Sequence, residues 1–387
     1  NLIVWLYSLF IYLNKLIPNG ILYSVAGSIG KPVSQELIYS HRALLFIHHN
    51  PVVFKKLTFF IQKIFSQINF FAHGAKIHRS SANFESMIYP AAQPVPEIEI
   101  KAPFIEKAGV QLIVRREDLN HPHISGNKYW KLKYNLLEAG KLGHHTLLTF
   151  GGAFSNHIAA TAAACKAVGL KSIGVIRGED ADLTNPTLAL ALENGMVLHR
   201  ISRAKYREKE FASFADEMRM LFGDFFLIPE GGTNDLAIKG ASEMVARIDT
   251  PFDYLALPVG TGGTMAGCID CLRGQGQILG FSALKGNFLT EEIIALQQQY
   301  SLSAFGNWDM INHYHFGGYG KVKDDLIVFM KAFEDQYAIP LDPVYTGKMM
   351  FGLLEMIKNA YFRKGSVIYT IHTGGLQGRA GFRRIPA

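Results

Sequence analysis

From residue 96 onward, short β-rich runs alternate with longer stretches of helical periodicity. The alternation favours a mostly parallel sheet with helices on both faces, because parallel strands need a crossover connection that is usually a helix. The sequence therefore predicts an α/β fold. The expected strands are residues 111–115, 146–150, 172–176, 226–228, 254–257 and 366–371. The expected helices are residues 129–142, 156–168, 235–248 and 347–362.

Most of the positive charge lies ahead of this α/β pattern. The chain of 387 residues has a formal net charge of +7, and residues 1–86 carry eight lysines and arginines against two glutamates. The rest of the chain is close to neutral and has no basic stripe. We therefore expect no nucleic-acid partner, because neutralising a phosphate backbone needs clustered lysines and arginines.

Residues 1–86 also differ in their apolar pattern. Residues 2–13 are almost wholly apolar, but a run of about a dozen is shorter than the roughly 20 residues that cross a bilayer. Residues 52–71 mix apolar and aromatic side chains with lysines, which is typical of a helix on a membrane surface. Two interpretations stay open: a membrane-surface anchor, or a leader that is not native protein, with Met87 as the true start.

The three cysteines include one Cys-x-x-Cys pair, Cys268 and Cys271, which would suit half of a redox or metal site. No second cysteine or histidine pair stands at zinc spacing nearby, and the segment after Val259 has helical character. We therefore expect these thiols in or beside the core, and no metal. Sparse cysteines in odd number also fit a reducing compartment, so the predicted location is the cytoplasm.

Ligands of open α/β sheets bind at the carboxyl ends of strands, in the loops that lead into helices. The first such loop is Ser125-Gly126-Asn127-Lys128, just ahead of the helix predicted for residues 129–142. The positive end of the helix dipole should lower the pKa of the Lys128 ammonium. An imine-forming lysine requires a lowered pKa, although an ordinary surface lysine remains the alternative when this loop is taken alone.

A second loop, residues 149–157, runs from a strand through Gly151 and Gly152 into a helix. The two glycines let a ligand approach the backbone closely, and Ser155 and Asn156 occupy the N-cap region of the helix. Ser155 is therefore expected either to cap the helix or to contact a ligand.

A third loop again joins a strand to a helix through glycines, as Gly260-Thr261-Gly262-Gly263-Thr264. Its backbone amides and threonine hydroxyls would form a phosphate cradle at a helix N-terminus. The third glycine of a dinucleotide-binding loop is missing, and so is the Gly-Lys-Ser/Thr of a P-loop. The loop therefore predicts a phosphate site that is neither a dinucleotide-binding loop nor a P-loop.

Further segments accompany these loops: Lys131-Leu132 after Lys128, His157 after Ser155-Asn156, Asp342-Pro343-Val344-Tyr345-Thr346-Gly347-Lys348, and His372-Thr373-Gly374-Gly375-Leu376. Together they resemble the fold-type II enzymes that use pyridoxal 5'-phosphate (PLP), the tryptophan synthase beta-like superfamily. Within these, the chain resembles the 1-aminocyclopropane-1-carboxylate (ACC) deaminase/D-cysteine desulfhydrase family over about residues 96–380. The resemblance implies two domains of open, twisted, mostly parallel sheets and a homodimer. Residues 87–130 and 245–387 would form a large PLP-binding domain, and residues 131–244 a small α/β domain.

The resemblance also implies a role for each matching residue. Lys128 would hold PLP as a Schiff base and carry the Cα proton of the substrate. Ser155 would contact the substrate carboxylate or act on the substrate, and Tyr319 and Tyr345 would be active-site tyrosines, one of them near the cofactor ring. The implied cofactor-binding residues are Lys128, Asn156 at the 3'-oxygen, Gly260, Thr261, Gly262, Gly263, Thr264, Tyr345, Thr346 and Thr373.

Two positions favour one branch of the family. ACC-type members resemble Tyr-Glu-Gly-Lys where this chain has Tyr345-Thr346-Gly347-Lys348, and His-Leu-Gly-Gly where it has Thr373 after His372. A carboxylate beside the pyridine nitrogen would stabilise a protonated ring, whereas a hydroxyl tolerates a neutral ring, which suffices for β-elimination. The resemblance thus implies a PLP-dependent lyase that converts D-cysteine, or a related small amino acid, to pyruvate, sulfide and ammonia.

Alternatives stay open at this point. Within the enzymes they are ACC deamination, or dehydration of a hydroxy amino acid by another fold-type II member. From a different class, the chain would be a catalytically silent PLP-binding protein, or a membrane-associated one if residues 1–86 are genuine.

Overall fold

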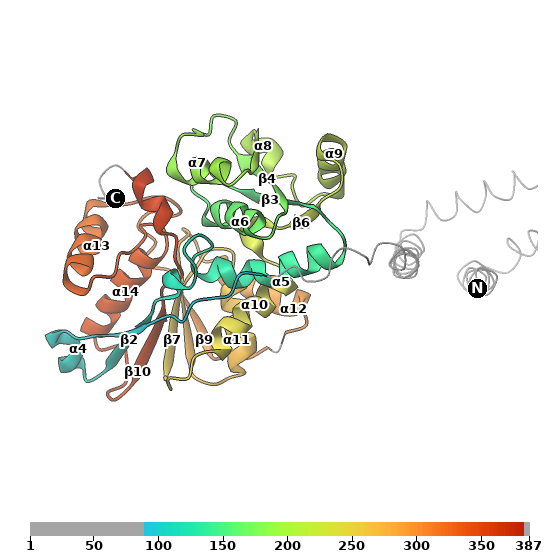
Figure 1. Ribbon diagram of the computed structural model, residues 1–387. Helices are drawn as coiled ribbons and strands as arrows, with labels where there is room; N and C mark the ends of the chain where they lie inside the picture. The colour runs from blue at the N-terminus through green and yellow to red at the C-terminus, as the bar shows by residue number, and fades with distance from the viewer. Residues whose placement is uncertain (1–88, 303, 383–387) are drawn as a thin grey trace, which may run out of the picture. The chain divides into compact units, whose positions relative to one another are not determined.

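The computed structural model describes residues 89–302 and 304–382, which form two sheets with flanking helices (Figure 1). The larger sheet has the strand order β1-β2-β10-β7-β8-β9. Its neighbouring strands are parallel except for β1, which runs antiparallel to β2. The strands are β1 (Glu97–Ile100), β2 (Gln111–Arg115), β7 (Tyr254–Val259), β8 (Gln277–Ser282), β9 (Trp308–Ile311) and β10 (Val367–Ile371).

The smaller sheet has the order β5-β4-β3-β6, and all of its pairs are parallel. Its strands are β3 (Thr146–Gly151), β4 (Lys171–Arg177), β5 (Val197–Ile201) and β6 (Phe226–Ile228). The carboxyl ends of β3 and β7 both lead through glycines into helices, which places two of the predicted loops at the ligand-binding ends of the two sheets.

The α-helices are α4 (Pro103–Ala108), α5 (Asn127–Lys141), α6 (Asn156–Ala167), α7 (Pro186–Glu193), α8 (Arg203–Tyr206), α9 (Ala212–Phe222), α10 (Asp235–Ala246), α11 (Gly263–Leu272), α12 (Leu289–Gln299), α13 (Asp324–Tyr337) and α14 (Thr346–Lys358). Short 3-10 helices are η2 (Glu117–Leu119), η3 (Glu230–Gly232) and η4 (Leu376–Gly381). Within the described ranges, no helix is both long enough and apolar enough to cross a lipid bilayer.

The larger sheet is buried on both faces. On β2, Leu112 and Val114 pack into one core with α13 and α14, whereas Ile113 packs into a second core with α5, α10 and α11. Figure 1 shows these two groups of helices on opposite sides of the sheet. Alternate residues of each strand thus enter different cores, and both must be apolar, which produces the nearly continuous apolar runs of the sequence.

The predicted fold class is confirmed, and the six predicted strands correspond to β2, β3, β4, β6, β7 and β10. The four predicted helices correspond to α5, α6, α10 and α14. The sequence analysis missed β1, β5, β8 and β9. Of these, β1, β5 and β9 lie at sheet edges and are partly exposed, so they lack a continuous apolar run. The fourth, β8, is interrupted by Gly280, a residue that is depleted in strands.

The domain prediction concerns three parts of the chain. Residues 1–86 lie outside the described residues. Strands before residue 131 and after residue 244 belong to the larger sheet, and those between them belong to the smaller sheet. Since both sheets lie in one compact unit, their behaviour as separate domains stays a prediction.

The Cys-x-x-Cys pair lies in α11, as the helical character of this segment indicated. Cys268 is buried and Cys271 is half-buried, and neither forms a disulfide. Burial raises the pKa of both thiols. These cysteines therefore lie in and beside the core, as expected.

Candidate active site

A cavity of about 280 Å³ lies where the loops after β3 and β7 meet the loop after β10. All predicted site residues except Thr346 line it: Lys128, Ser155, Asn156, Gly260, Thr261, Gly262, Gly263, Thr264, Tyr319, Tyr345 and Thr373. Residues more than 240 positions apart in the sequence, such as Lys128 and Thr373, are thus brought to one site.

The turn ahead of Lys128 has room for glycine alone. Gly126 has a φ of 75°, and a Cβ at this position would lie 2.0 Å from the Thr373 carbonyl oxygen. The next residue, Asn127, donates its backbone N–H to the same oxygen at 3.3 Å. Helix α5 therefore starts against the loop after β10, with Lys128 in its first turn.

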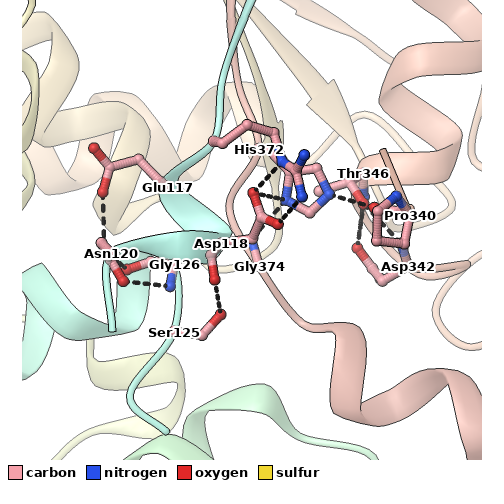
Figure 2. A network of polar contacts seen from close by, with 11 residues as sticks. Glu117, Asp118, Asn120, Ser125, Gly126, Pro340, Asp342, Thr346, His372 and Gly374 are labelled. Carbon is pink, nitrogen blue, oxygen red and sulfur yellow. Dashed lines mark hydrogen bonds and ion pairs between the residues drawn. The ribbon is translucent and has the colours of Figure 1, made fainter. Parts of the chain in front are cut away.

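Polar residues after β2 hold this turn in place (Figure 2). The Asn120 side chain accepts from the Gly126 backbone N–H at 3.1 Å and donates to the Gly126 carbonyl at 2.9 Å. The Ser125 hydroxyl donates to the Asp118 carbonyl oxygen at 3.1 Å. Both sides of the Gly126 peptide are therefore fixed, and with them the direction in which Lys128 leaves the backbone.

The Lys128 amine has a lowered pKa, as the sequence predicted. Burial lowers it to about 8, and the nearby Asp342 carboxylate opposes the shift. The sequence argument attributed the lowering to the helix dipole, but enclosure in the cavity is the largest cause. The Nζ atom donates to Asn127 Oδ1 at 3.1 Å. An amine with a pKa near 8 is neutral often enough to attack an aldehyde and can also carry a proton.

The loop after β3 combines a helix cap with a cavity wall. Ser155 Oγ accepts from the Ile158 backbone N–H at 3.4 Å and so caps α6, and the same residue lines the cavity. The two interpretations of Ser155 are therefore compatible. The free backbone N–H groups at the start of α6 favour an anionic group such as a substrate carboxylate.

The loop after β7 forms the opposite wall with a buried amine beside it. A Cβ on Gly263 would lie 3.0 Å from Lys131 Nζ and 2.9 Å from Thr233 Oγ1, so this space exists because the residue is glycine. Lys131 Nζ donates to the Gly231 carbonyl oxygen at 2.7 Å and to Thr233 Oγ1 at 3.1 Å. Asn127 Nδ2 donates to Thr264 Oγ1 at 2.8 Å, which fixes this loop to the Lys128 turn.

The residues present fit PLP. The start of α11 offers backbone N–H groups, the Thr261 and Thr264 hydroxyls and the Lys131 amine to a phosphate. Lys128 offers an amine to the aldehyde from across the same cavity. Burial and the neighbouring Lys128 lower the pKa of Lys131 well below its ordinary value, a cost that a bound anion would relieve.

The two predicted tyrosines lie together at the cavity. Their ring centroids are 6.2 Å apart at 69°, an edge-on contact. A Cβ on Gly260 would lie 3.1 Å from the Tyr345 ring, so the phosphate loop packs directly on this tyrosine. Burial raises the pKa of both Tyr319 and Tyr345, so both hydroxyls keep their protons at neutral pH and can donate.

Thr346 is the exception among the predicted residues. It is fully buried at the start of α14 and does not line the cavity. Its hydroxyl donates to Asp342 Oδ2 at 2.7 Å and accepts from the Asp342 backbone N–H at 2.8 Å (Figure 2). Thr346 therefore closes the turn that leads into α14, and its predicted contact with the pyridine nitrogen stays a prediction.

Other cavity residues received no role from the sequence: Lys131, His157, Arg177 and Glu230. Lys131 and His157 stood in the motifs quoted above without an assigned contact. Arg177 is the last residue of β4. Because ligands bind at the carboxyl ends of strands, this position could have marked it as a site residue. Glu230 follows the short strand β6 in the same way.

The tautomer of His157 follows from its neighbours. The Thr149 hydroxyl donates to the Ile228 carbonyl oxygen at 2.9 Å, so it must accept the 2.8 Å hydrogen bond from His157 Nε2. The buried Nδ1 is then an acceptor, and it has no hydrogen-bond partner among the described residues. Burial, with Lys128 and Lys131 nearby, lowers the pKa of His157 well below its ordinary value. A neutral imidazole therefore lines the cavity.

Comparisons with known proteins agree with this chemistry. Residues 91–374 match the family described as "Pyridoxal-phosphate dependent enzyme". The chain is 33% identical over 289 residues to a Thermotoga maritima protein named "Putative 1-aminocyclopropane-1-carboxylate deaminase", with 70% of this chain and 91% of that protein covered. It is 28% identical over 297 residues to the "Bifunctional D-cysteine desulfhydrase/1-aminocyclopropane-1-carboxylate deaminase, mitochondrial" of Arabidopsis thaliana, with 70% and 73% covered.

A solved structure described as "Crystal Structure Analysis of the ACC deaminase homologue" is similar with a TM-score of 0.66 at 26% identity. The match covers 76% of this chain and 95% of that chain. Because the family match covers most of its length, the chain belongs to the fold-type II pyridoxal-phosphate dependent enzymes.

Proposed function

We propose that this enzyme is a D-cysteine desulfhydrase, which converts D-cysteine to pyruvate, sulfide and ammonia. The observation that carries the proposal is the Lys128 amine, with a pKa of about 8, in the same small cavity as a glycine-rich helix start. A relative named in part as a D-cysteine desulfhydrase supports the choice of substrate.

PLP, when bound, supplies an electron sink that makes the Cα proton of an amino acid acidic. Lys128 Nζ would bind the cofactor aldehyde and would accept the Cα proton of the substrate. A general base works best when its pKa lies near the operating pH, which the value of about 8 satisfies.

The other cavity residues would orient the substrate and the leaving group. The N-terminus of α6 and the Ser155 hydroxyl line the cavity and would bind the amino-acid carboxylate. The hydroxyls of Tyr319 and Tyr345 interact with each other and keep their protons, so one of them can donate to a departing sulfur. When the Cβ–S bond breaks, sulfide leaves with a proton and aminoacrylate remains, which water converts to pyruvate and ammonium.

Thr373 favours desulfhydration over ACC deamination. It lines the cavity, and its position resembles a leucine in the ACC-type pattern. A threonine hydroxyl at this wall can form a hydrogen bond with a ligand, which the leucine of the ACC-type pattern cannot do. The second position used for this choice, Thr346, is bonded to Asp342 instead, so Thr373 supports the proposal more directly. ACC deamination is the second candidate, because the relatives named above include both activities.

Substrate profiling of the PLP-loaded enzyme tests the proposal. D-cysteine, L-cysteine and ACC are offered separately, and sulfide, pyruvate and ammonium are measured. We expect equal amounts of sulfide, pyruvate and ammonium from D-cysteine, and none from Lys128→Ala. Lys141→Ala, which removes an exposed lysine from the same helix, is the matched control and should behave as wild type. Turnover of ACC without sulfide release from D-cysteine would sink the assignment.

We also propose that the enzyme works in a reducing compartment such as the cytoplasm. The three cysteines are free thiols, and two of them, Cys165 and Cys268, are buried in the core. Burial raises the pKa of Cys165 to about 12, which keeps this thiol protonated and unreactive. Labelling of the native protein in its source cells would test the location, and an oxidising compartment would contradict it.

A further inference from the structure

Asn156, the residue predicted to face the 3'-oxygen of PLP, accepts a hydrogen bond from a side chain that lies far away in the sequence. Gln377 Nε2 donates to Asn156 Oδ1 at 2.6 Å. Asn156 lies in the first turn of α6, after a strand of the smaller sheet, and Gln377 lies in η4, after the last strand of the larger sheet. The bond therefore joins the two sheets beside the cavity.

In this contact the oxygen of the Asn156 amide faces Gln377. An asparagine amide can present either its oxygen or its NH₂ group after a half-turn, and the two choices have opposite hydrogen-bonding character. Since Gln377 donates to the oxygen, Asn156 Nδ2 is left as the free end. Among the described residues, no group accepts a hydrogen bond from this Nδ2 atom, although Asn156 lines the cavity.

Gly375 gives the Asn156 amide its space. This glycine has a φ of 95°, and a Cβ on it would lie 2.3 Å from Asn156 Nδ2. Any side chain at position 375 would push the amide away from the loop after β10. The loop thus contributes two features to the same amide: a gap at Gly375 and a donor at Gln377.

We infer that Gln377 is a positioning residue, which holds Asn156 with its NH₂ group turned to the cavity so that it can donate to the 3'-oxygen of PLP. The inference rests on the role proposed for Asn156. The 3'-oxygen carries negative charge, so it needs a donor, and an asparagine turned the other way would present an oxygen and repel it. Gln377 therefore acts through Asn156 and needs no contact of its own with the cofactor.

Two substitutions separate this role from simple packing. Gln377→Glu removes the donor, and its carboxylate can pair only with Asn156 Nδ2, which takes the NH₂ group away from the cofactor. Gln377→Leu has a similar size and no charge, and it leaves the amide free to adopt both orientations. Gln298→Glu, on the exposed face of α12, is the matched control for the added charge.

The measurements are the PLP dissociation constant and the visible absorption band of the PLP-loaded protein. We expect the dissociation constant to rise about tenfold for Gln377→Glu, the loss of one hydrogen bond to a charged oxygen, and about threefold for Gln377→Leu. The band of Gln377→Glu should shift in the same direction as that of Asn156→Ala. Gln298→Glu should match wild type in both measurements.

A double-mutant cycle with Asn156→Ala completes the test. If Gln377 acts through Asn156, adding Gln377→Glu to Asn156→Ala changes the dissociation constant by less than about twofold. Equal urea midpoints would show that the variants are folded, and Gln377→Leu serves if Gln377→Glu is not. An unchanged constant and band in the folded Gln377 variants, or effects that multiply in the double mutant, would overturn the inference. These readouts need no substrate, so a failure of D-cysteine turnover would leave the result intact.

Discussion

Three lysines near the candidate site have lowered pKa values, but they differ in what their amines contact. Lys131 Nζ donates to the Gly231 carbonyl oxygen, and Lys348 Nζ donates to the Gly318 carbonyl oxygen. Among the residues that the structure describes, Lys128 Nζ donates only to the side chain of its neighbour Asn127. A side-chain contact is easier to exchange than a bond to a fixed carbonyl, so Lys128 is the amine that is available for covalent chemistry.

The pKa of Lys128 predicts how PLP uptake depends on pH. The amine must be neutral to attack the aldehyde, and its pKa is about 8. The rate of PLP incorporation into the apoprotein should rise with pH and level off above about 8, and below that pH it should fall by about tenfold per unit. Stopped-flow absorbance measures this rate. A rate that still rises tenfold per unit up to pH 10 would show an ordinary lysine.

Thr346 gives a prediction about stability. Its hydroxyl both donates to and accepts from Asp342, and both residues are buried. Thr346→Val keeps the shape and removes both bonds, so the free energy of unfolding should fall by about 2 kcal/mol. Thr346→Ser keeps the hydroxyl and should cost less. Urea unfolding compares the two, and equal losses would mean that the methyl group matters more than the hydroxyl.

At the residue level, the sequence indicated the groups that carry a local pattern. Lys128 and Thr264 stand in loops whose glycines mark them, so they could be predicted. Gln377 could not, because its partner Asn156 lies 221 positions away and nothing local indicates the pairing. Arg177 was missed for a different reason: it ends an ordinary strand and has no distinctive neighbours.

Inner strands with nearly continuous apolar sequences were predictable, although the buried strand β8, which Gly280 interrupts, was missed and the edge strand β6 was found. β7 and β10 lie inside the larger sheet and have nearly continuous apolar sequences. β5 and β9 lie at edges, and their exposed residues, such as Arg200 and Asp309, interrupt the pattern. The strands that lead into the site are mostly inner strands. The site loops were therefore found, although four other strands were missed.

The loop that carries Tyr319 is held by an element far from it in the sequence. Lys348, in α14, donates from its buried amine to the Gly318 carbonyl oxygen at 2.8 Å. Burial lowers the pKa of Lys348 to about 8, and the Asp342 carboxylate opposes the shift. Helix α14 therefore helps to position Tyr319, which lies outside the helix.

Lys348→Met tests this connection. Below pH 8 the folded and unfolded states of wild type both hold the Lys348 proton. Between pH 8 and the ordinary value of 10.5 the unfolded state binds it more tightly, so stability rises with pH. Wild type should gain about 1 kcal/mol relative to the methionine variant between pH 8 and 9. Urea unfolding at both pH values measures this difference, and a constant difference would contradict the buried, titrating amine.

The variant should also affect catalysis. Without the bond to Gly318, the Tyr319 loop is less well placed, and we expect kcat/KM for D-cysteine to fall about tenfold, the effect of about 1.4 kcal/mol. Lys358→Met, which removes an exposed lysine of the same helix, is the control. Normal catalysis by Lys348→Met would show that Lys348 does not position the Tyr319 loop for catalysis.

At the scale of the whole molecule, one cavity joins the two sheets. The cavity is lined by the last residue of β4 and residues after β3 in the smaller sheet, and by residues after β7 and β10 in the larger sheet. A ligand in this cavity binds the folded arrangement and not the unfolded chain. PLP at 100 times its dissociation constant should therefore raise the free energy of unfolding by about 2.7 kcal/mol. Hydrogen exchange should show added protection in both sheets, and protection confined to one sheet would contradict a shared site.

The homodimer implied by the family resemblance stays a prediction. Sedimentation equilibrium of the PLP-loaded protein would give its mass directly, and a value near the 43.0 kDa of one chain would contradict a dimer.

The most direct test of the whole account is to find which lysine binds PLP. Borohydride reduction makes the link between the cofactor and the lysine amine permanent, and peptide mass mapping then locates it. We predict the added mass on Lys128 alone, and none on Lys131 or Lys348, whose amines are bonded to backbone carbonyls. Label on either of those lysines, or no label at all, would contradict the account.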